Sequence, residues 1–177
     1  VFLDNNDNNI KILDNRKQVI TEETAYQITS MLEGAVKRGT GKKLRNLNVP
    51  LAGKTGTTND NFDAWFIGFT SNLVIGVYIG YDEPKSLGKY ETGSKVALPV
   101  FKKFIETALY KEDLRPFIVP EGIYFYPIDY DSGDLTNFAD SKSITESFKE
   151  NSSQNVRLKN LNFGKNYGKS FKFKGFY

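Results

Sequence analysis

The residues most able to do chemistry stand in the stretch Leu51–Asp60, which reads LAGKTGTTND. It places Lys54 among glycines and residues with small hydroxyl side chains. An ammonium and several hydroxyl groups close together can hold an anion, because all of them donate hydrogen bonds to it. Three structures present such a set: a phosphate-binding loop, a strand that borders a catalytic cleft, and an ordinary turn.

The phosphate-binding loop can be tested by its spacing. That loop requires Gly-x-x-x-x-Gly-Lys-Ser/Thr between a strand and a helix. Gly53, Lys54 and Thr55 supply its end, but the position of its first glycine is occupied by Asn48. The residues that follow, FDAWFIGFT, are typical of a strand and not of a helix. We therefore expect no nucleotide phosphate site here.

The composition restricts the chemistry further, because the 177 residues include no cysteine and no histidine. This excludes disulfides, thiol nucleophiles, Cys/His zinc sites and histidine bases. We expect neither a metal nor a cofactor. Any catalysis would depend on lysine, serine, threonine, tyrosine or carboxylate side chains.

A helix is predicted immediately before this stretch. Thr21 is a good N-cap, and the two glutamates that follow it suit the first turn of a helix. Lys37 and Arg38 suit the last turn, and Gly39 is expected to end the helix. The apolar residues at helical spacing, which we expect to pack in the core, are Ala25, Ile28, Leu32, Ala35 and Val36.

Three strand-like runs follow, at about residues 51–57, 62–69 and 73–81. The short turns between them favour antiparallel pairing. A second amphipathic helix is predicted over about residues 98–110, with Pro99 in its first turn. The predicted fold class is therefore α+β, an antiparallel sheet packed with helices, with Lys-Thr-Gly on the first strand of the sheet.

The composition changes beyond Lys111. We expect a C-terminal extension with short extended segments over residues 111–138. Residues 139–177 begin rich in Ser and Asn and end with bases interleaved with aromatics, and we expect them to be disordered. Such a basic tail can contact single-stranded nucleic acid, a membrane surface or an anionic envelope polymer. We expect no nucleic-acid partner.

The order of these pieces resembles the C-terminal part of the transpeptidase domain of class A, or bifunctional, penicillin-binding proteins. The segments that carry the resemblance are ETAYQITSMLEGAVKRGTG, GKTGTT, FDAWFIGFT and VYIGYD, in that order. It covers roughly residues 10–135 and implies a fold like that of serine β-lactamases and penicillin-binding proteins. Residues 1–110 would be the C-terminal half of the transpeptidase domain.

The resemblance implies partners and a location. The partners would be the peptidoglycan stem peptide and β-lactams. The location would be the periplasmic side of the bacterial inner membrane, with membrane contact only through a part that precedes this chain. That missing part would also hold a glycosyltransferase domain.

The resemblance also implies catalytic roles for two residues of the motif. Lys54 would hold positive charge at the cleft. The backbone N–H of Thr57 would be one half of an oxyanion hole, where it would stabilise the charge that develops on the substrate carbonyl.

Substrate binding would involve the hydroxyl groups around Lys54. Thr55 and Thr57 would bind the terminal carboxylate of a D-Ala-D-Ala peptide or of a β-lactam. Gly56 would allow the substrate to approach closely, because it has no Cβ. The other residues matched by the resemblance are Thr58 and Thr40 as substrate-binding residues, and Asp63 and Trp65 as architectural ones, with Trp65 in the core.

The chain departs from the family pattern in one respect. The family's chemistry needs a Ser-x-x-Lys, which supplies nucleophile and base, and a Ser-x-Asn, both ahead of Lys-Thr-Gly. Neither occurs ahead of Lys54, and the letter matches at Ser86–Lys89 and Ser153–Asn155 come in the wrong order and in polar segments. We therefore expect a fragment of a D-Ala-D-Ala transpeptidase that is inactive by itself. The alternatives are a non-catalytic remnant and a module that binds wall peptides.

Overall fold

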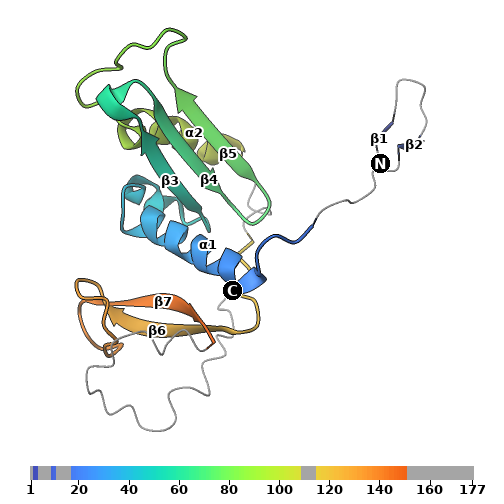
Figure 1. Ribbon diagram of the computed structural model, residues 1–177, viewed down its shortest axis with the longest axis vertical. Helices are drawn as coiled ribbons and strands as arrows, with labels where there is room; N and C mark the ends of the chain where they lie inside the picture. The colour runs from blue at the N-terminus through green and yellow to red at the C-terminus, as the bar shows by residue number, and fades with distance from the viewer. Residues whose placement is uncertain (1, 4–8, 11–16, 109–114, 151–177) are drawn as a thin grey trace.

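The computed structural model describes residues 2–3, 9–10, 17–108 and 115–150 (Figure 1). The helices are α1 (Glu22–Lys37) and α2 (Leu98–Ala108), with short helical turns η1 (Lys42–Leu47), η2 (Asn59–Asn61) and η3 (Gly93–Ala97). The strands are β1 (Phe2–Leu3), β2 (Asn9–Ile10), β3 (Ala52–Thr57), β4 (Ala64–Phe69), β5 (Val74–Ile79), β6 (Ile123–Asp129) and β7 (Ser143–Lys149). The predicted α+β class is confirmed.

The central sheet has the order β3-β4-β5, and both pairs of strands are antiparallel, as predicted. Its register sets Gly56 opposite Trp65, and Trp65 opposite Tyr78. The β3–β4 turn contains Asp60 and Asn61 with φ of 57° and 55°. Aspartate and asparagine tolerate this left-handed conformation better than other non-glycine residues. The Lys-Thr-Gly motif therefore lies on an edge strand that a tight polar turn joins to the sheet centre.

Helix α1 begins where the sequence predicts. Thr21 is its N-cap, and the Thr21 side chain accepts a hydrogen bond from the N–H of Thr24. The predicted apolar stripe is only partly buried, however. Val36 lies in the core, whereas Ile28 remains 50% exposed. The expectation that the whole stripe packs in the core is wrong for Ala25 and Ile28, because only the C-terminal part of α1 meets the core cluster.

The core lies between one face of the sheet and α2 (Figure 1). The rings of Phe66 on β4 and Phe101 on α2 meet at 4.6 Å, and both residues are fully buried. Helix α2 begins at Leu98, as predicted, but it continues directly from the π-helical turn η3. Residues 109 and 110, at the predicted end of this helix, lie outside the described residues.

The segment 139–150 corrects the sequence prediction. It was expected to be disordered, but residues 143–149 form β7, which pairs antiparallel with β6 along its whole length. The low hydrophobicity of this strand concealed it. Cross-strand neighbours, such as the Tyr126 and Phe148 rings at 5.7 Å, provide the missing apolar contacts. Residues 151–177, which hold the basic tail, lie outside the described residues.

The β6–β7 hairpin lies along α1 (Figure 1). The rings of Tyr26 and Phe125 meet edge to face at 6.1 Å, and the Gln27 side chain donates to the carbonyl of Ser147 at 3.2 Å. Near the C-terminal end of α1, the Arg38 guanidinium binds the Glu146 carboxylate at 2.6 Å. The hairpin thus contacts α1 near both ends. In the described ranges, no helix is both long enough and apolar enough to cross a bilayer.

Candidate active site

The site is built along the open edge of β3. The N–H of Thr58 donates to the carbonyl of Asp63 at 3.0 Å, so this pair is hydrogen-bonded across the strands. Hydrogen-bonded and non-hydrogen-bonded pairs alternate in an antiparallel ladder. The backbone groups of Thr57 and Thr55 therefore point away from β4, toward the free edge. This orientation makes the N–H of Thr57 available to a substrate atom.

Lys54 lies over this edge. Its side chain is exposed, and its ammonium donates to the Thr55 carbonyl at 3.1 Å and approaches the Thr55 hydroxyl at 3.5 Å. The ammonium has three N–H groups and an exposed position, so it remains able to bind an anion at the same edge. Lys54 therefore adds positive charge at the edge where the backbone groups of Thr55 and Thr57 face outward.

Thr40 comes to the site from the loop that ends α1. The N–H of Gly41 donates to the Ala35 carbonyl at 3.0 Å, which folds the loop back over the helix end. A Cβ at Gly41 would lie 3.0 Å from Cα of Val36, a tight contact with the helix backbone that glycine avoids. The fold brings the hydroxyls of Thr40 and Thr55 to 2.9 Å. One hydroxyl of the pair donates to the other, and the second keeps its proton for a ligand.

Gly56 makes room for a neighbouring side chain within the sheet. A Cβ on this residue would come within 3.2 Å of Cβ of Trp65 on the neighbouring strand. Trp65 is 38% exposed, so the expectation that it belongs to the core is wrong. Its ring packs against that of Tyr78 at 4.7 Å, on the sheet face opposite to α2. Gly56 thus accommodates this aromatic pair.

Thr58 closes the β3–β4 turn. Its hydroxyl accepts from the N–H of Asp63 at 2.8 Å and donates to the Asp63 carboxylate at 3.4 Å. That carboxylate also accepts from the Tyr78 phenol at 2.9 Å, and this hydrogen bond raises the pKa of Tyr78. Asp63 therefore has the architectural role expected of it. The structure gives Thr58 a role in the turn, and its binding of substrate stays a prediction.

The arrangement brings together five donor groups. They are the Lys54 ammonium, the hydroxyls of Thr40, Thr55 and Thr57, and the N–H of Thr57. Such a set can hold a carboxylate and stabilise an oxyanion, because the Lys54 ammonium, both Thr57 groups and one hydroxyl of the Thr40–Thr55 pair can donate to negative oxygen. Within residues 17–108 and 115–150, no group of three acidic side chains is placed to hold a metal ion.

Sequence reasoning missed one residue of the site, Gly93. Its N–H donates to the Thr57 hydroxyl at 3.0 Å, across 36 positions of sequence. A glycine before an apolar helix was visible in the sequence. No local pattern linked this glycine to β3, because the contact depends on how the start of the helix packs on the sheet.

Comparison with known proteins decides the family. The family model for the penicillin binding protein transpeptidase domain matches residues 6–106, more than half of the chain. The chain belongs to the penicillin-binding protein transpeptidase family. The resemblance drawn from the Lys-Thr-Gly segment is confirmed.

Individual relatives agree with the family match. The chain is 45% identical to penicillin-binding protein 1A of Rickettsia felis over 137 residues, which are 77% of this chain. It is 43% identical to penicillin-binding protein 1A of Pseudomonas aeruginosa over 114 residues, or 64% of this chain. These alignments span only 17% and 14% of the two relatives. The chain therefore spans only a small part of the length of these relatives.

A solved structure confirms the fold. The crystal structure of penicillin-binding protein 1A from Haemophilus influenzae superposes with a TM-score of 0.64 at 33% sequence identity. The match covers 74% of this chain and 21% of that one. The expected fold, the C-terminal portion of a penicillin-binding-protein transpeptidase, is therefore correct. The boundaries expected at residues 110 and 138 stay predictions.

Proposed function

We propose that this chain supplies one wall of the cleft of a peptidoglycan D-Ala-D-Ala transpeptidase. The observation that carries the proposal is the open edge of β3, where the N–H of Thr57 lies among hydroxyl groups and the Lys54 ammonium. The donor set suits a short peptide that ends in a carboxylate and has a carbonyl one residue earlier. The relatives compared above are penicillin-binding proteins, which supports the same ligand class, including β-lactams.

Each residue has a defined task in this proposal. The hydroxyls of Thr40, Thr55 and Thr57 hold the terminal carboxylate, and the N–H of Thr57 donates to the scissile carbonyl oxygen. Lys54 stabilises negative charge at the edge. A hydrogen-bond donor that is already oriented toward the developing oxyanion lowers the barrier without reorganisation at the moment of reaction. The attacking serine and its lysine base would come from residues outside this chain.

The proposed location is the periplasmic side of the bacterial inner membrane, where stem peptides are cross-linked. Membrane contact would come through a part of the protein outside these 177 residues. The similarity to penicillin-binding protein 1A of several bacteria supports this placement.

A direct test uses the ¹⁵N-labelled chain in dilute solution. We expect N-acetyl-D-Ala-D-Ala to shift the backbone amide signals of Thr55 and Thr57 saturably. The same peptide with a C-terminal amide should bind at least about tenfold more weakly, because it lacks the charged acceptor. Shifts spread over the whole surface, or equal binding of both peptides, would count against the proposal.

A second candidate is a wall-peptide-binding module without chemistry, or a remnant. It is favoured by one observation, that no Ser-x-x-Lys precedes Lys54 in this sequence. The reading frame upstream of Val1 separates the candidates. An in-frame Ser-x-x-Lys followed by Ser-x-Asn identifies a fragment of an active enzyme, and a stop codon with a genuine start identifies a module or remnant.

A further inference from the structure

The helical segment formed by η3 and α2 begins directly against β3. Its first residue, Gly93, donates its N–H to Oγ1 of Thr57 at 3.0 Å. The first N–H groups of a helix have no acceptor within the helix, so each needs a partner elsewhere. Here the hydroxyl of a site residue is the partner of one of them.

The approach of Gly93 to the sheet leaves no space for a side chain. A Cβ at this position would lie 2.3 Å from the carbonyl oxygen of Trp65 and 2.5 Å from that of Gly56. Both are backbone atoms of paired strands, so neither can rotate away as a side chain would. Gly93 is also buried. Any other residue would therefore push the start of the helix away from Thr57.

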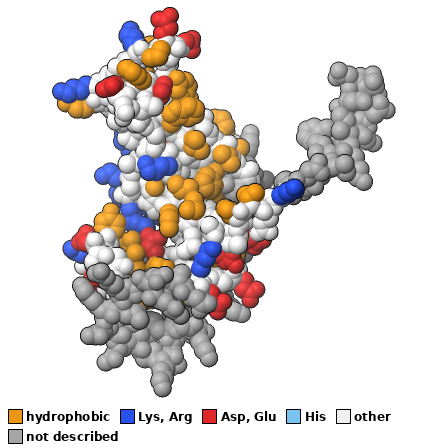
Figure 2. Space-filling model, viewed as in Figure 1, with side chains coloured by type: hydrophobic (Ala, Val, Ile, Leu, Met, Phe, Trp, Pro, Cys, Tyr) orange, Lys and Arg blue, Asp and Glu red, His pale blue; other side chains and the backbone are white. Residues whose placement is uncertain are grey.

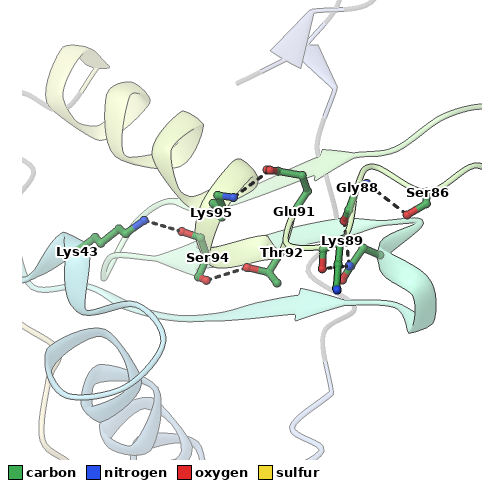
Figure 3. A network of polar contacts seen from close by, with 9 residues as sticks. Lys43, Ser86, Gly88, Lys89, Glu91, Thr92, Ser94 and Lys95 are labelled. Carbon is green, nitrogen blue, oxygen red and sulfur yellow. Dashed lines mark hydrogen bonds and ion pairs between the residues drawn. The ribbon is translucent and has the colours of Figure 1, made fainter.

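Hydrogen bonds hold the chain around Gly93 at several points (Figure 3). The Lys43 ammonium, from η1, donates to the carbonyl of Ser94 at 3.4 Å. On the other side, the Asn61 amide donates to the carbonyls of Gly88 and Lys89, each at 3.0 Å. These contacts join the segment 88–94 to η1 and to the β3–β4 turn. The position of the Gly93 N–H is therefore fixed relative to β3.

We propose that Gly93 is a positioning residue that orients the Thr57 hydroxyl as a donor to the substrate carboxylate. A backbone N–H can only donate, so the Thr57 oxygen must accept from it. No hydrogen bond among the described residues uses the Thr57 hydroxyl proton, and that side chain is exposed. The proton thus remains available to an external acceptor. A carboxylate has only acceptor sites, whereas an amide end presents N–H groups as well.

This inference rests on the proposed function and adds to it an explanation of the preference for a free carboxylate. It assigns the preference for a free carboxylate partly to a residue that does not touch the ligand. The Thr40–Thr55 pair can exchange its proton direction, because either oxygen can donate. Thr57 has no such freedom while Gly93 donates to it. We therefore expect Thr57 to contribute more to carboxylate selectivity than Thr40 does.

The first part of the test concerns the hydrogen bond and needs no ligand. In the ¹⁵N-labelled chain, the Gly93 amide proton should exchange slowly with solvent, and Thr57→Val should increase its exchange rate at least about tenfold. Thr57→Ser retains the hydroxyl and should restore protection. Both variants change one exposed side chain, so they are informative even if a Gly93 variant fails to fold. Equal protection in wild type and Thr57→Val would overturn the proposal.

The second part measures the binding of N-acetyl-D-Ala-D-Ala and of its C-terminal amide. Gly93→Ala should weaken carboxylate binding about tenfold and leave amide binding nearly unchanged, because the loss concerns one charge-assisted hydrogen bond. The matched control is Gly76→Ala on β5, where a new Cβ would find its nearest neighbour, Cγ1 of Ile67, at 4.0 Å. That control should keep the wild-type preference.

The outcomes separate this inference from the proposed function. A folded Gly93→Ala chain with the full wild-type preference for carboxylate would overturn the inference alone. A wild-type chain without any preference would overturn the proposed function, and the inference with it. A loss of preference in Gly93→Ala, with Gly76→Ala unaffected, would support both.

Discussion

At the residue scale, the Thr40–Thr55 contact joins the end of α1 to β3 in the site. Both hydroxyls lie at the surface, 2.9 Å apart, so the contact costs little to remove from the folded chain. Its importance lies in ligand binding, where two hydroxyls together present one ordered proton to an anion.

We expect Thr40→Val to weaken the binding of N-acetyl-D-Ala-D-Ala by about fivefold, the effect of one ordinary hydrogen bond of ~1 kcal/mol. The free energy of unfolding should change by less than about 0.5 kcal/mol, because the residue is exposed. Peptide titration and urea denaturation measure the two quantities. Thr40→Ser should bind as wild type does, and Thr145→Val is the matched control remote from the site, because Thr145 is an exposed residue of β7. An unchanged affinity in Thr40→Val would exclude Thr40 from the carboxylate site.

At the scale of elements, the β6–β7 hairpin stabilises the end of α1 that leads to Thr40. The Arg38 guanidinium lies over Gly34, where a Cβ would be 2.7 Å from one of its nitrogens, and reaches Glu146 at 2.6 Å. Their side chains are 33% and 19% exposed. Partial shielding from solvent makes such a pair stronger than a fully exposed one, although solvent screening still reduces its contribution.

A double-mutant cycle of Arg38→Ala and Glu146→Ala should give a coupling free energy of about 0.5–1 kcal/mol. The coupling should decrease in 1 M salt, because ions screen the pair. Urea denaturation at low and high salt measures it. The control is the Lys37–Glu33 pair at 3.2 Å within α1, for which we expect about 0.3–0.5 kcal/mol. Coupling no larger than in this control would mean that the ion pair does not hold the hairpin on α1.

At the scale of the whole molecule, one face of the central sheet carries exposed apolar side chains. The register places Trp65 opposite Tyr78 and Phe69 opposite Val74 on the face that α2 does not cover. Val74 is 72% exposed, Ile67 50% and Tyr78 48%. Figure 2 shows hydrophobic side chains gathered over this region of the molecule. Contiguous apolar surface of this kind promotes association in water.

We therefore expect the chain to bind a hydrophobic dye and to associate as its concentration rises. Val74→Lys should reduce both effects with a change in stability of less than about 1 kcal/mol, because the side chain is exposed. Dye fluorescence measures the binding of the dye, and sedimentation velocity measures the association of the chain. Val100→Lys is the matched control, since Val100 is 51% exposed but lies on α2. If both variants reduced association equally, the exposed sheet face would not be the surface through which the chains associate.

Much of the local structure was predictable from the sequence. The capping threonine and glutamates set the start of α1, and strand-like runs separated by short polar turns predicted β3, β4 and β5. These signals are local, because caps, turns and periodicity act within a few residues. Strand β7 was not predictable, because its stability comes from pairing with β6 and docking on α1.

The sequence by itself determined that Lys54, Thr55 and Thr57 lie on one strand in a chain without histidine or cysteine, and that no Ser-x-x-Lys precedes them. Only the tertiary structure decided which backbone groups face the open edge, that Thr40 reaches Thr55, and that Gly93 donates to Thr57. The physical reason is the range of the interactions. Local propensities depend on neighbouring residues, whereas hydrogen bonds across 15 or 36 positions exist only after the helices have packed on the sheet.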